Sequence, residues 1–424
     1  MEQLRVPQRS IGLDVHPTTV YVTLLDPSTE RFEQYEFPME PRAFEAFLGS
    51  LRPGDRVALE ATGNTWLLHR QIKEVVDDVV VAETTQLKRL LGNGRKTDRN
   101  DSMVIAYLAY IGGLPTVWVP DPDTQHAREF LQYRTGLVKD QTRWMNRIRA
   151  LFRKYGLACP ASDLQSKDGQ LFLVKAQSLL PWYAQEQLAT MMEQLDILGK
   201  SLERAAAIAE KMAEKRGTEA ELLSTIPGVD SLLAVTILAC IGNINRFPTP
   251  ASLANYAGVV PSVHSSGKKR RHGSITKKGS RMLRWAVTQA IQSLRNVPGP
   301  FRNLYRRLSR GDKAGRAVVA CARKLLIVIW HMLRKGEAFR GAEPEKLARK
   351  DARRRNRRLK AGVTLADSKA RHHQALAGNL ALLRELALRK ESNTTFPEQL
   401  RAHLRPGTES DQLLRMKTRK PAPR

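Results

Sequence analysis

Short apolar runs that end in a carboxylate mark the first quarter of the chain. Ile11–Leu13 runs directly into Asp14, and a second strand-like run, Tyr21–Leu25, follows almost at once, as in a β-hairpin. A third run, Val57–Leu59, ends in Glu60 just before a turn-forming Thr-Gly-Asn sequence. The pattern predicts β-strands, two of which end in an acidic side chain.

A helix is predicted immediately after a second pair of acids. Asp98 and Asp101 lie three residues apart at the start of the helix-like stretch Met103–Leu108, so both project from one helical face. Taken singly, each of the four acids is more often structural, because an Asp after a strand is usually a turn residue and Asp98 could be only an N-cap. Together, in this order, they are much less easily explained as structural residues.

Helical periodicity dominates the middle of the chain. Apolar residues recur at four-then-three spacing over residues 144–155, and a heptad seam runs over more than three repeats within residues 188–212. A loop between Pro160 and Pro181 separates the two halves. The pattern fits an intramolecular antiparallel helical hairpin and a dimer-forming coiled coil equally well.

Two apolar helices joined by a Pro-Gly turn are predicted further on. Residues 222–226 lead through Pro227 and Gly228 into the apolar run 232–238. This arrangement looks like a helix-hairpin-helix, in which the turn presents backbone N–H groups to a DNA phosphate. As a bare pattern it also fits an ordinary turn between two helices.

The stretch between Asp230 and Asp312 contains no acidic residue, so it cannot form a carboxylate metal site by itself. It is dense in Lys and Arg, and its predicted partner is a polyanion. Within it, Ser265 and Ser266 precede Gly267 and a basic cluster. A hydroxyl in this setting can approach a phosphate while nearby cations stabilise the developing charge, although such a serine is more often a backbone-phosphate contact. The basic side chains predicted to contact nucleic acid are Lys268, Lys269, Arg270, Arg271, Lys277, Lys278 and Arg281.

Composition supports a nucleic-acid partner. The 424-residue chain has a net charge of +28, and its 42% apolar content is enough for two or three domain cores. Such a charge attracts phosphate through counterion release; an anionic membrane is the rival polyanion, but the sequence shows neither a spanning segment nor a signal peptide. Cys159, Cys240 and Cys321 are far apart, which fits a reducing cytosol and not a structural zinc site.

The four acids suit a divalent cation. Converging carboxylates repel one another unless a cation neutralises them, and Mg²⁺ prefers hard oxygen ligands while leaving positions open for phosphate and water. Two such ions about 3.5–4 Å apart stabilise both the attacking and the leaving oxygen of a phosphodiester displacement. We therefore predict that Asp14, Glu60, Asp98 and Asp101 form a catalytic Mg²⁺ site.

These motifs together resemble a known family. The order strand-Asp, hairpin, strand-Glu, helix with Asp-x-x-Asp resembles the ribonuclease-H-like (RuvC-like) fold of Holliday-junction resolvases. The sequences at residues 11–14, 59–63 and 96–101 look like the DEDD motifs of the insertion-sequence-110 transposases. Residues 256–284, with Gly-x-x-Pro, Ser-Gly and Ser/Thr-Lys-x-Gly motifs, are similar to the second domain of the same transposases.

The resemblance implies an α/β plus all-α architecture. It predicts a RuvC-like mixed-sheet domain over residues 1–118, a helical coiled-coil or dimerisation segment over 119–217, and a mainly helical serine transposase domain with the helix-hairpin-helix over 218–341. A basic C-terminal tail over 342–424 lies beyond the resemblance. Its basic run, 346–360, fits either an arm that grips nucleic acid or a merely solvated tail.

The resemblance also implies a function. Ser266 would attack a DNA phosphodiester, assisted by the Mg²⁺-binding acids. Ser265 is the adjacent residue, and a shift of one residue in the alignment to the family would make it the nucleophile instead. Strand exchange by transesterification would follow, guided by a structured non-coding bridge RNA that the element encodes. Relatives form dimers that pair into tetramers, in which the carboxylates of one subunit complete a site with the serine of another. The protein is expected to be prokaryotic, cytoplasmic and nucleoid-associated.

Two other functions stay open. One is a Mg²⁺-dependent DNA junction nuclease in which Ser266 only binds phosphate. The other is a non-catalytic nucleic-acid-binding protein, against which the four intact acids argue, because a binder has no use for negative charge facing DNA. The histidines add little: His264 and His272 flank the serine and could contact phosphate, and His16, beside Asp14, is predicted to be a structural turn residue.

Overall fold

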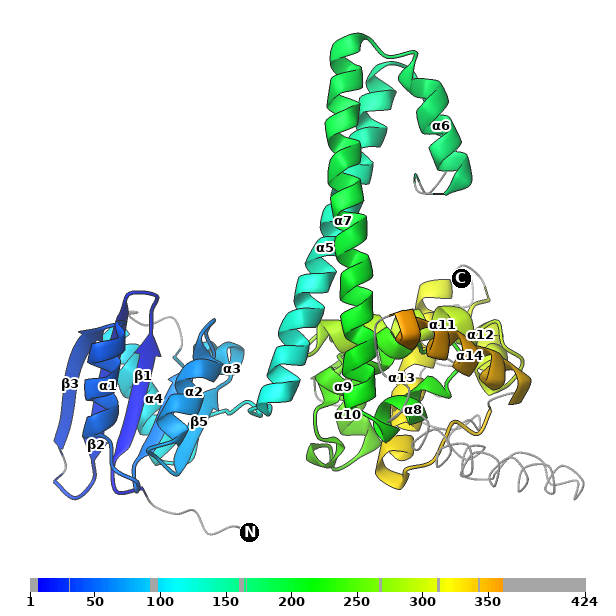
Figure 1. The fold of residues 1–424 in the computed structure, drawn as a ribbon. Helices are drawn as coiled ribbons and strands as arrows, with labels where there is room; N and C mark the ends of the chain where they lie inside the picture. Colours follow the sequence, from blue (N-terminus) through cyan, green and yellow to red (C-terminus); the bar gives the residue numbers. More distant parts are fainter. Residues whose placement is uncertain are drawn as a thin grey trace, which may run out of the picture. The chain divides into compact units, whose positions relative to one another are not determined.

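The chain forms two compact units, the first ending at Gln125 and the second beginning at His126 (Figure 1). No helix within the described ranges is long and apolar enough to cross a lipid bilayer. The structure, a computed structural model, describes residues 7–29, 31–91, 98–159, 164, 166–266, 269–310, 313–341 and 344–360.

A five-stranded mixed sheet forms the centre of the first unit, in the order β3-β2-β1-β4-β5. Strands β1, β2 and β3 form an antiparallel meander, whereas β4 runs parallel to β1 and β5 runs parallel to β4. The predicted mixed sheet and its opening hairpin are confirmed. The strands are β1 (Ser10–Val15), β2 (Thr19–Asp26), β3 (Arg31–Pro38), β4 (Arg56–Glu60) and β5 (Asp78–Ala82).

Alternate side chains of β1 point to opposite faces of the sheet, and helices cover both faces. Ile11, Leu13 and Val15 enter an apolar core that contains Phe44 of α1 and Leu68 of α2. Helix α4 packs against β1 and β2, and it shares a second apolar cluster with α3. The helices are α1 (Pro41–Ser50), α2 (Thr65–Lys73), α3 (Thr84–Leu91) and α4 (Asp98–Tyr110).

Helix α4 packs directly against the backbone of β1 at Gly12. A Cβ atom at this position would lie 2.2 Å from the carbonyl oxygen of Ser102 and 2.5 Å from the backbone nitrogen of Ala106. The Ser10 hydroxyl donates to the Ala106 carbonyl at 2.8 Å, and the hydroxyls of Thr23 and Ser102 are 2.8 Å apart. The missing side chain of Gly12 therefore permits the close spacing between α4 and the sheet.

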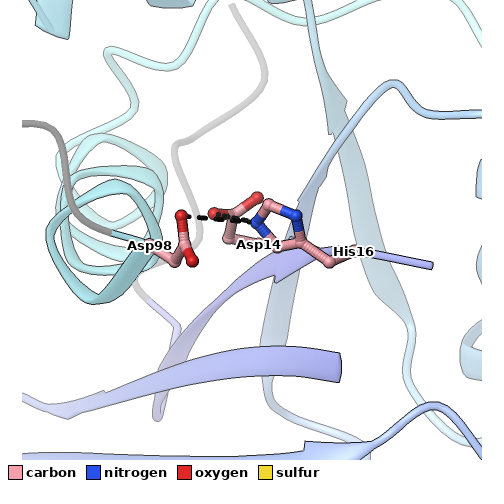
Figure 2. Close-up of side chains that lie close together, drawn as sticks. All are labelled: Asp14, His16 and Asp98. Atoms are coloured by element: carbon pink, nitrogen blue, oxygen red, sulfur yellow. Dashed lines mark hydrogen bonds and ion pairs between the residues drawn. The ribbon is translucent and has the colours of Figure 1, made fainter. Parts of the chain in front are cut away.

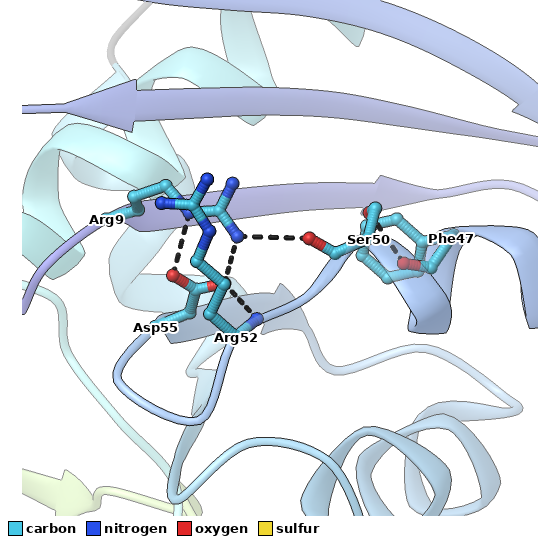
Figure 3. A network of polar contacts seen from close by, with 5 residues as sticks. All are labelled: Arg9, Phe47, Ser50, Arg52 and Asp55. Carbon is cyan, nitrogen blue, oxygen red and sulfur yellow. Dashed lines mark hydrogen bonds and ion pairs between the residues drawn. The ribbon is translucent and has the colours of Figure 1, made fainter.

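A buried ion pair fastens the start of β1 to the loop before β4 (Figure 3). Arg9 donates from Nε to Asp55 Oδ1 at 2.9 Å and from Nη2 to Asp55 Oδ2 at 2.6 Å. It also donates to the Ser50 carbonyl at 3.1 Å, and Asp55 accepts from the Arg52 backbone N–H at 2.7 Å. The hydrogen bond to Asp55 raises the pKa of Arg9. Both buried charges are thus hydrogen-bonded as well as paired.

Two long helices of the second unit lie side by side (Figure 1). They are α5 (Pro122–Lys154) and α7 (Trp182–Lys215), with α6 (Lys167–Gln177) between them in the sequence. Apolar residues of all three helices share one cluster, including Phe152 of α5, Leu173 of α6 and Leu188 of α7. The intramolecular antiparallel hairpin is therefore the arrangement that this chain adopts, and the dimer-forming alternative stays a prediction.

The remainder of the second unit is mainly helical, with one two-stranded hairpin that the sequence patterns did not predict. Helix α9 is buried along almost its whole length and packs against α7 and α11. The elements are α8 (Thr218–Ser224), α9 (Ser231–Ile241), α10 (Pro250–Tyr256), β6 (Pro261–Ser266), β7 (Lys269–Ile275), α11 (Arg281–Leu294), α12 (Pro300–Leu308), α13 (Ala314–Lys335) and α14 (Pro344–Lys360).

The segment predicted as a basic tail contains a docked helix. Helix α14 packs against α7 and forms three ion pairs with glutamates of α7 and α8. The sequence left open an arm that grips nucleic acid and a merely solvated tail, and neither alternative included such packing; residues 361–424 lie outside the described part of the chain. The pairs are Arg354–Glu221 (3.0 Å), Arg357–Glu210 (3.1 Å) and Arg358–Glu214 (2.6 Å).

Candidate metal centre and DNA-contacting elements

Asp14, His16 and Asp98 form an acidic cluster where the end of β1 meets the first turn of α4 (Figure 2). His16 Nε2 lies 3.2 Å from Asp14 Oδ2 and 3.4 Å from Asp98 Oδ1. One potential ligand atom from each residue lies within 4.8 Å of the other two. Asp14 is buried, whereas the side chains of His16 and Asp98 are each 42% exposed. The cluster therefore opens to solvent on one side.

The negative charge of Asp14 is unfavourable in the acidic cluster, because the side chain is buried and lies near other carboxylates. Burial raises the pKa of Asp14, the charge and hydrogen bond of His16 lower it, and the nearby carboxylates of Asp101 and Asp98 raise it further. The ionised form of Asp14 is thus disfavoured where it lies. A cation bound in the cluster would remove this penalty.

The other two predicted ligands lie outside the acidic cluster. Glu60 is the last residue of β4, and the parallel register pairs Leu59 with Leu13, so Glu60 follows on the strand next to Asp14. Neighbouring strands lie about 4.8 Å apart. Asp101 lies one helical turn after Asp98 and acts on Asp14 through its charge. The structure therefore gathers two of the four predicted acids, holds Asp101 on the same helix as Asp98, and holds Glu60 on β4, the strand next to β1.

His16 is the member of the acidic cluster that sequence reasoning missed. Its backbone N–H donates to the Thr19 carbonyl at 2.9 Å, which is the turn role predicted for it. That prediction was incomplete, because the ring also reaches both Asp14 and Asp98. Residues 14 and 16 are two apart, and this spacing places side chains on the same face of an extended chain. The spacing was the signal available in the sequence.

Ser266 is the last residue of β6, in the hairpin that carries the predicted nucleophile. Backbone pairing sets Ser266 opposite Lys269 and Ser265 opposite Arg270. Lys268 lies outside the described residues, as do the side chains of residues 263–270 and 272. The two candidate serines are thus distinguished by their partners in β7.

The glycines of the flanking motifs hold the base of this hairpin together. A Cβ atom on Gly258 (φ +66°) would lie 2.2 Å from the Lys278 carbonyl oxygen, and one on Gly279 (φ +84°) would lie 2.1 Å from the Tyr256 carbonyl oxygen. The Lys277 N–H donates to the Gly258 carbonyl at 3.1 Å. Two backbone segments therefore cross in direct contact, which requires glycine at both positions.

Cations surround the base of the hairpin. Of the side chains predicted to contact nucleic acid, four are described, and all four are exposed to solvent. They are positioned by β7, the glycine crossing and the start of α11. The four are Arg271, Lys277, Lys278 and Arg281.

A Pro-Gly turn joins α8 to α9, as the predicted helix-hairpin-helix requires. Gly228 has φ +86°, and a Cβ atom there would lie 2.9 Å from the Ala290 carbonyl oxygen and 2.5 Å from Ser293 Cβ. Asp230 caps α9 by accepting from the Leu233 N–H at 2.9 Å. Gly228 is therefore required for packing against α11, in addition to any contact with DNA.

Sequence comparison links both regions to known proteins. A model described as "Transposase IS116/IS110/IS902 family" matches residues 220–306, and a DEDD model described as "Transposase" matches residues 11–156. The chain is 30% identical over 255 residues to the "Transposase for insertion sequence element IS1111A" of Coxiella burnetii. This match covers 58% of the chain and 68% of that relative.

Further relatives carry similar names. The chain is 26% identical to the "Putative transposase y4qE" of Sinorhizobium fredii, over 65% of this chain and 67% of that protein. It is 24% identical to the "Probable family 20 transposase" of Pseudomonas aeruginosa, over 67% of this chain and 85% of that protein. The ranges matched by the two family models contain both the acidic cluster and the β6–β7 hairpin with Ser266. The chain therefore belongs to the IS116/IS110/IS902 family of insertion-sequence transposases.

Proposed function

We propose that this transposase is a DNA recombinase in which metal-binding carboxylates and the serine Ser266 act on the same phosphodiester. The observation that carries the proposal is the acidic cluster, in which Asp14 and Asp98 are gathered on one side of the sheet with Asp101 within electrostatic reach. A family of transposases acts on DNA, and a chain of net charge +28 is suited to that substrate.

The acidic cluster fits a hard divalent cation. Asp14 and Asp98 supply oxygen ligands, and Glu60 and Asp101 are further carboxylates on the neighbouring strand and on α4. The ionised form of Asp14 is disfavoured without a positive charge nearby. His16 contacts both cluster carboxylates and thereby orients them. When bound, Mg²⁺ neutralises these acids and polarises the scissile phosphate.

Ser266 supplies the nucleophile in this proposal. Its Oγ forms a bond to phosphorus and gives up its proton, while the bond from phosphorus to one sugar oxygen breaks and that oxygen takes up a proton. The products are a phosphoserine-linked strand end and a free hydroxyl. A hydroxyl from another strand then attacks the phosphoserine and releases Ser266. Because each step exchanges one phosphoester bond for another, no ATP is required.

The exposed cations around the hairpin position the DNA backbone for this attack. Arg271, Lys277, Lys278 and Arg281 are exposed, and contacts of this kind fix the register of a duplex without reading its sequence. Lys268, Lys269 and Arg270, together with the backbone N–H groups at Gly228, are the further phosphate contacts that we propose.

By resemblance to the family, target choice comes from a structured bridge RNA that pairs with donor and target DNA. The same resemblance supports dimers that pair into tetramers, with the acids of one subunit acting beside Ser266 of another. Such a composite site restricts cleavage to the assembled complex.

The alternative function is a RuvC-like, Mg²⁺-dependent DNA junction nuclease. In it the carboxylates direct hydrolysis, and Ser266 only binds phosphate. The gathered acids are common to both functions, whereas membership of a transposase family favours the recombinase. The two differ in whether the protein becomes covalently joined to DNA.

A denaturing-gel assay for a protein–DNA adduct separates the two functions. Protein, Mg²⁺, labelled element-end DNA and RNA transcribed from the element's flanks are mixed, with Asp14→Ala, Ser266→Ala and Ser265→Ala run beside the wild type. We expect an adduct that is lost in the Asp14 and Ser266 variants and kept in the Ser265 variant. Asp26→Ala, which removes an acid outside the cluster, is the matched control. Cleaved DNA without an adduct, unaffected in the Ser266 variant, would establish the nuclease.

A further inference from the structure

Helix α14 is fastened to the carbonyl groups that precede the Pro-Gly turn. Lys350 Nζ donates to the carbonyl oxygen of Ser224, the last residue of α8, and to that of Ile226 at 2.8 Å. Upstream of α14, the Phe339 N–H donates to Thr225 Oγ1 at 2.8 Å. These contacts join residues more than a hundred positions apart. Helix α14, which lies beyond the family-matched regions, therefore touches the predicted helix-hairpin-helix.

The inward face of α14 neutralises acids of α7 and α8. Arg354 pairs with Glu221 of α8, and their side chains are 12% and 18% exposed. Arg358 pairs with Glu214 of α7, with exposures of 8% and 17%. Without α14 these glutamates would face solvent on the same unit as the Pro-Gly turn, for which a phosphate contact is proposed above. The docked arginines therefore remove a source of repulsion between this unit and DNA.

A second row of arginines lies along the neighbouring flank of the same helix. Arg349 and Arg353 are exposed, and with Arg357 they follow the i, i+4, i+8 spacing that stacks side chains along one side of a helix. At about 1.5 Å per residue, this row extends roughly 12 Å. Its first member is adjacent in sequence to Lys350, which contacts the turn.

We propose that α14 is part of the DNA-contacting surface: its inward cations fix the Pro-Gly turn and neutralise Glu214 and Glu221, while Arg349 and Arg353 bind the phosphate backbone of duplex DNA. The inference rests on the proposed function, because it assigns this helix to the same substrate. Duplex DNA is the partner because its regularly spaced phosphates complement the row of arginines on α14. Burial lowers the pKa of Lys350, which agrees with a structural and not a phosphate-binding role for this one cation.

Binding of a labelled 30-base-pair duplex of mixed sequence, without Mg²⁺, tests the outer arginine row. In the full chain, Arg349→Ala/Arg353→Ala is expected to weaken binding at least about tenfold and to reduce the salt slope by about 2, since each lost phosphate contact removes about 0.9. Arg153→Ala/Lys175→Ala removes two exposed cations from α5 and α6 and is the matched control. Equal weakening in both pairs would mean that only net charge matters and would overturn the proposal.

A charge exchange tests the inward face. Glu221→Arg adds positive charge, so general electrostatics predicts tighter DNA binding, whereas loss of α14 docking predicts weaker binding. We expect weaker binding, with recovery in Glu221→Arg/Arg354→Glu, which restores the ion pair in reverse. Tighter binding in the single variant, or no recovery in the double variant, would refute a role for docking.

The remaining outcomes separate the inference from the proposed function. A wild-type protein that does not bind the duplex would overturn the role of α14, whereas the adduct assay, which contains Mg²⁺ and RNA, tests the proposed function separately. A wild type that binds, with an unchanged Arg349→Ala/Arg353→Ala variant, would overturn only the role of α14. The same variants are measured with an RNA hairpin of equal length, and a loss confined to RNA would refute duplex DNA as the partner.

Discussion

Gly12 is the residue on which the geometry of the acidic cluster depends. Gly12→Ala is expected to separate α4 from β1, because the new methyl group would lie 2.2 Å from the Ser102 carbonyl oxygen. Overpacking of this kind costs about 1–3 kcal/mol. Displacement of α4 also moves Asp98 away from Asp14. If the acidic cluster binds Mg²⁺ as we propose, the ion raises the melting temperature of the wild type, and we expect this rise to be lost in Gly12→Ala when both are measured by calorimetry with and without Mg²⁺.

Gly49→Ala is the control for this prediction. Gly49 lies in α1, and a Cβ atom there meets nothing within 4 Å. The substitution should leave stability unchanged or raise it by about 0.4–1 kcal/mol, with an intact Mg²⁺ response. A Gly12 variant that still responds to Mg²⁺ like the wild type would contradict the role given to close packing.

The Arg9–Asp55 pair leads to a second prediction at the residue scale. Asp55→Ala is expected to lower the free energy of unfolding by about 3–5 kcal/mol, because it leaves the Arg9 charge buried and unpaired. Asp78→Ala breaks the Arg56–Asp78 pair, whose aspartate is 42% exposed, and should cost about 1 kcal/mol or less. Denaturant titration of both variants checks the contrast, and equal losses would contradict it.

At the scale of elements, sequence patterns predicted the strands and helices that depend only on neighbouring residues, and missed those that depend on distant contacts. The strand that contains Asp14, the strand that ends in Glu60 and the helix that begins with Asp98 follow from apolar runs and from three-residue spacing. The β6–β7 hairpin was missed because neither strand, the Ser-containing β6 nor the Lys- and Arg-rich β7, shows an apolar alternation, and because the hairpin depends on the crossing of Gly258 and Gly279. The docking of α14 was missed because its partners lie over a hundred residues away.

The docking of α14 by Lys350 has a predicted pH dependence. Burial, followed by smaller effects of charged neighbours, lowers the pKa of Lys350 from 10.5 to about 8. Between these values the unfolded chain binds more protons than the folded one, so this residue makes stability rise with pH across that interval. Asp230 and Asp351 raise the pKa, and Arg354 and Arg357 lower it.

Thermal unfolding at pH 7.5 and pH 10 compares the wild type with Lys350→Met. The wild type is expected to gain up to about 3 kcal/mol more than the variant over this range, since one pKa unit corresponds to about 1.36 kcal/mol. Other titrating groups contribute equally to both proteins and cancel in the difference. Parallel pH profiles would show that Lys350 is not buried in solution.

At the scale of the whole molecule, the net charge of +28 dictates how DNA binding responds to salt. If the basic surface contacts about six to ten phosphates, duplex affinity should fall about 10³- to 10⁵-fold between 50 and 200 mM salt. Fluorescence anisotropy across this range measures the slope. A slope shallower than about −3 would mean that most of the cations do not contact DNA.

The position of the acidic cluster in the chain has a consequence for protein synthesis. Both elements that carry it, β1 and α4, are complete by Tyr110, whereas Ser266 is added 156 residues later. At about 5–20 residues per second, the ribosome adds the serine roughly 8–30 s after the last residue of α4. If the acidic cluster binds a metal and Ser266 is the nucleophile, as we propose, a growing or prematurely terminated chain can bind the metal before it has a nucleophile. On that proposal, translation order itself keeps unfinished copies from becoming covalently attached to DNA.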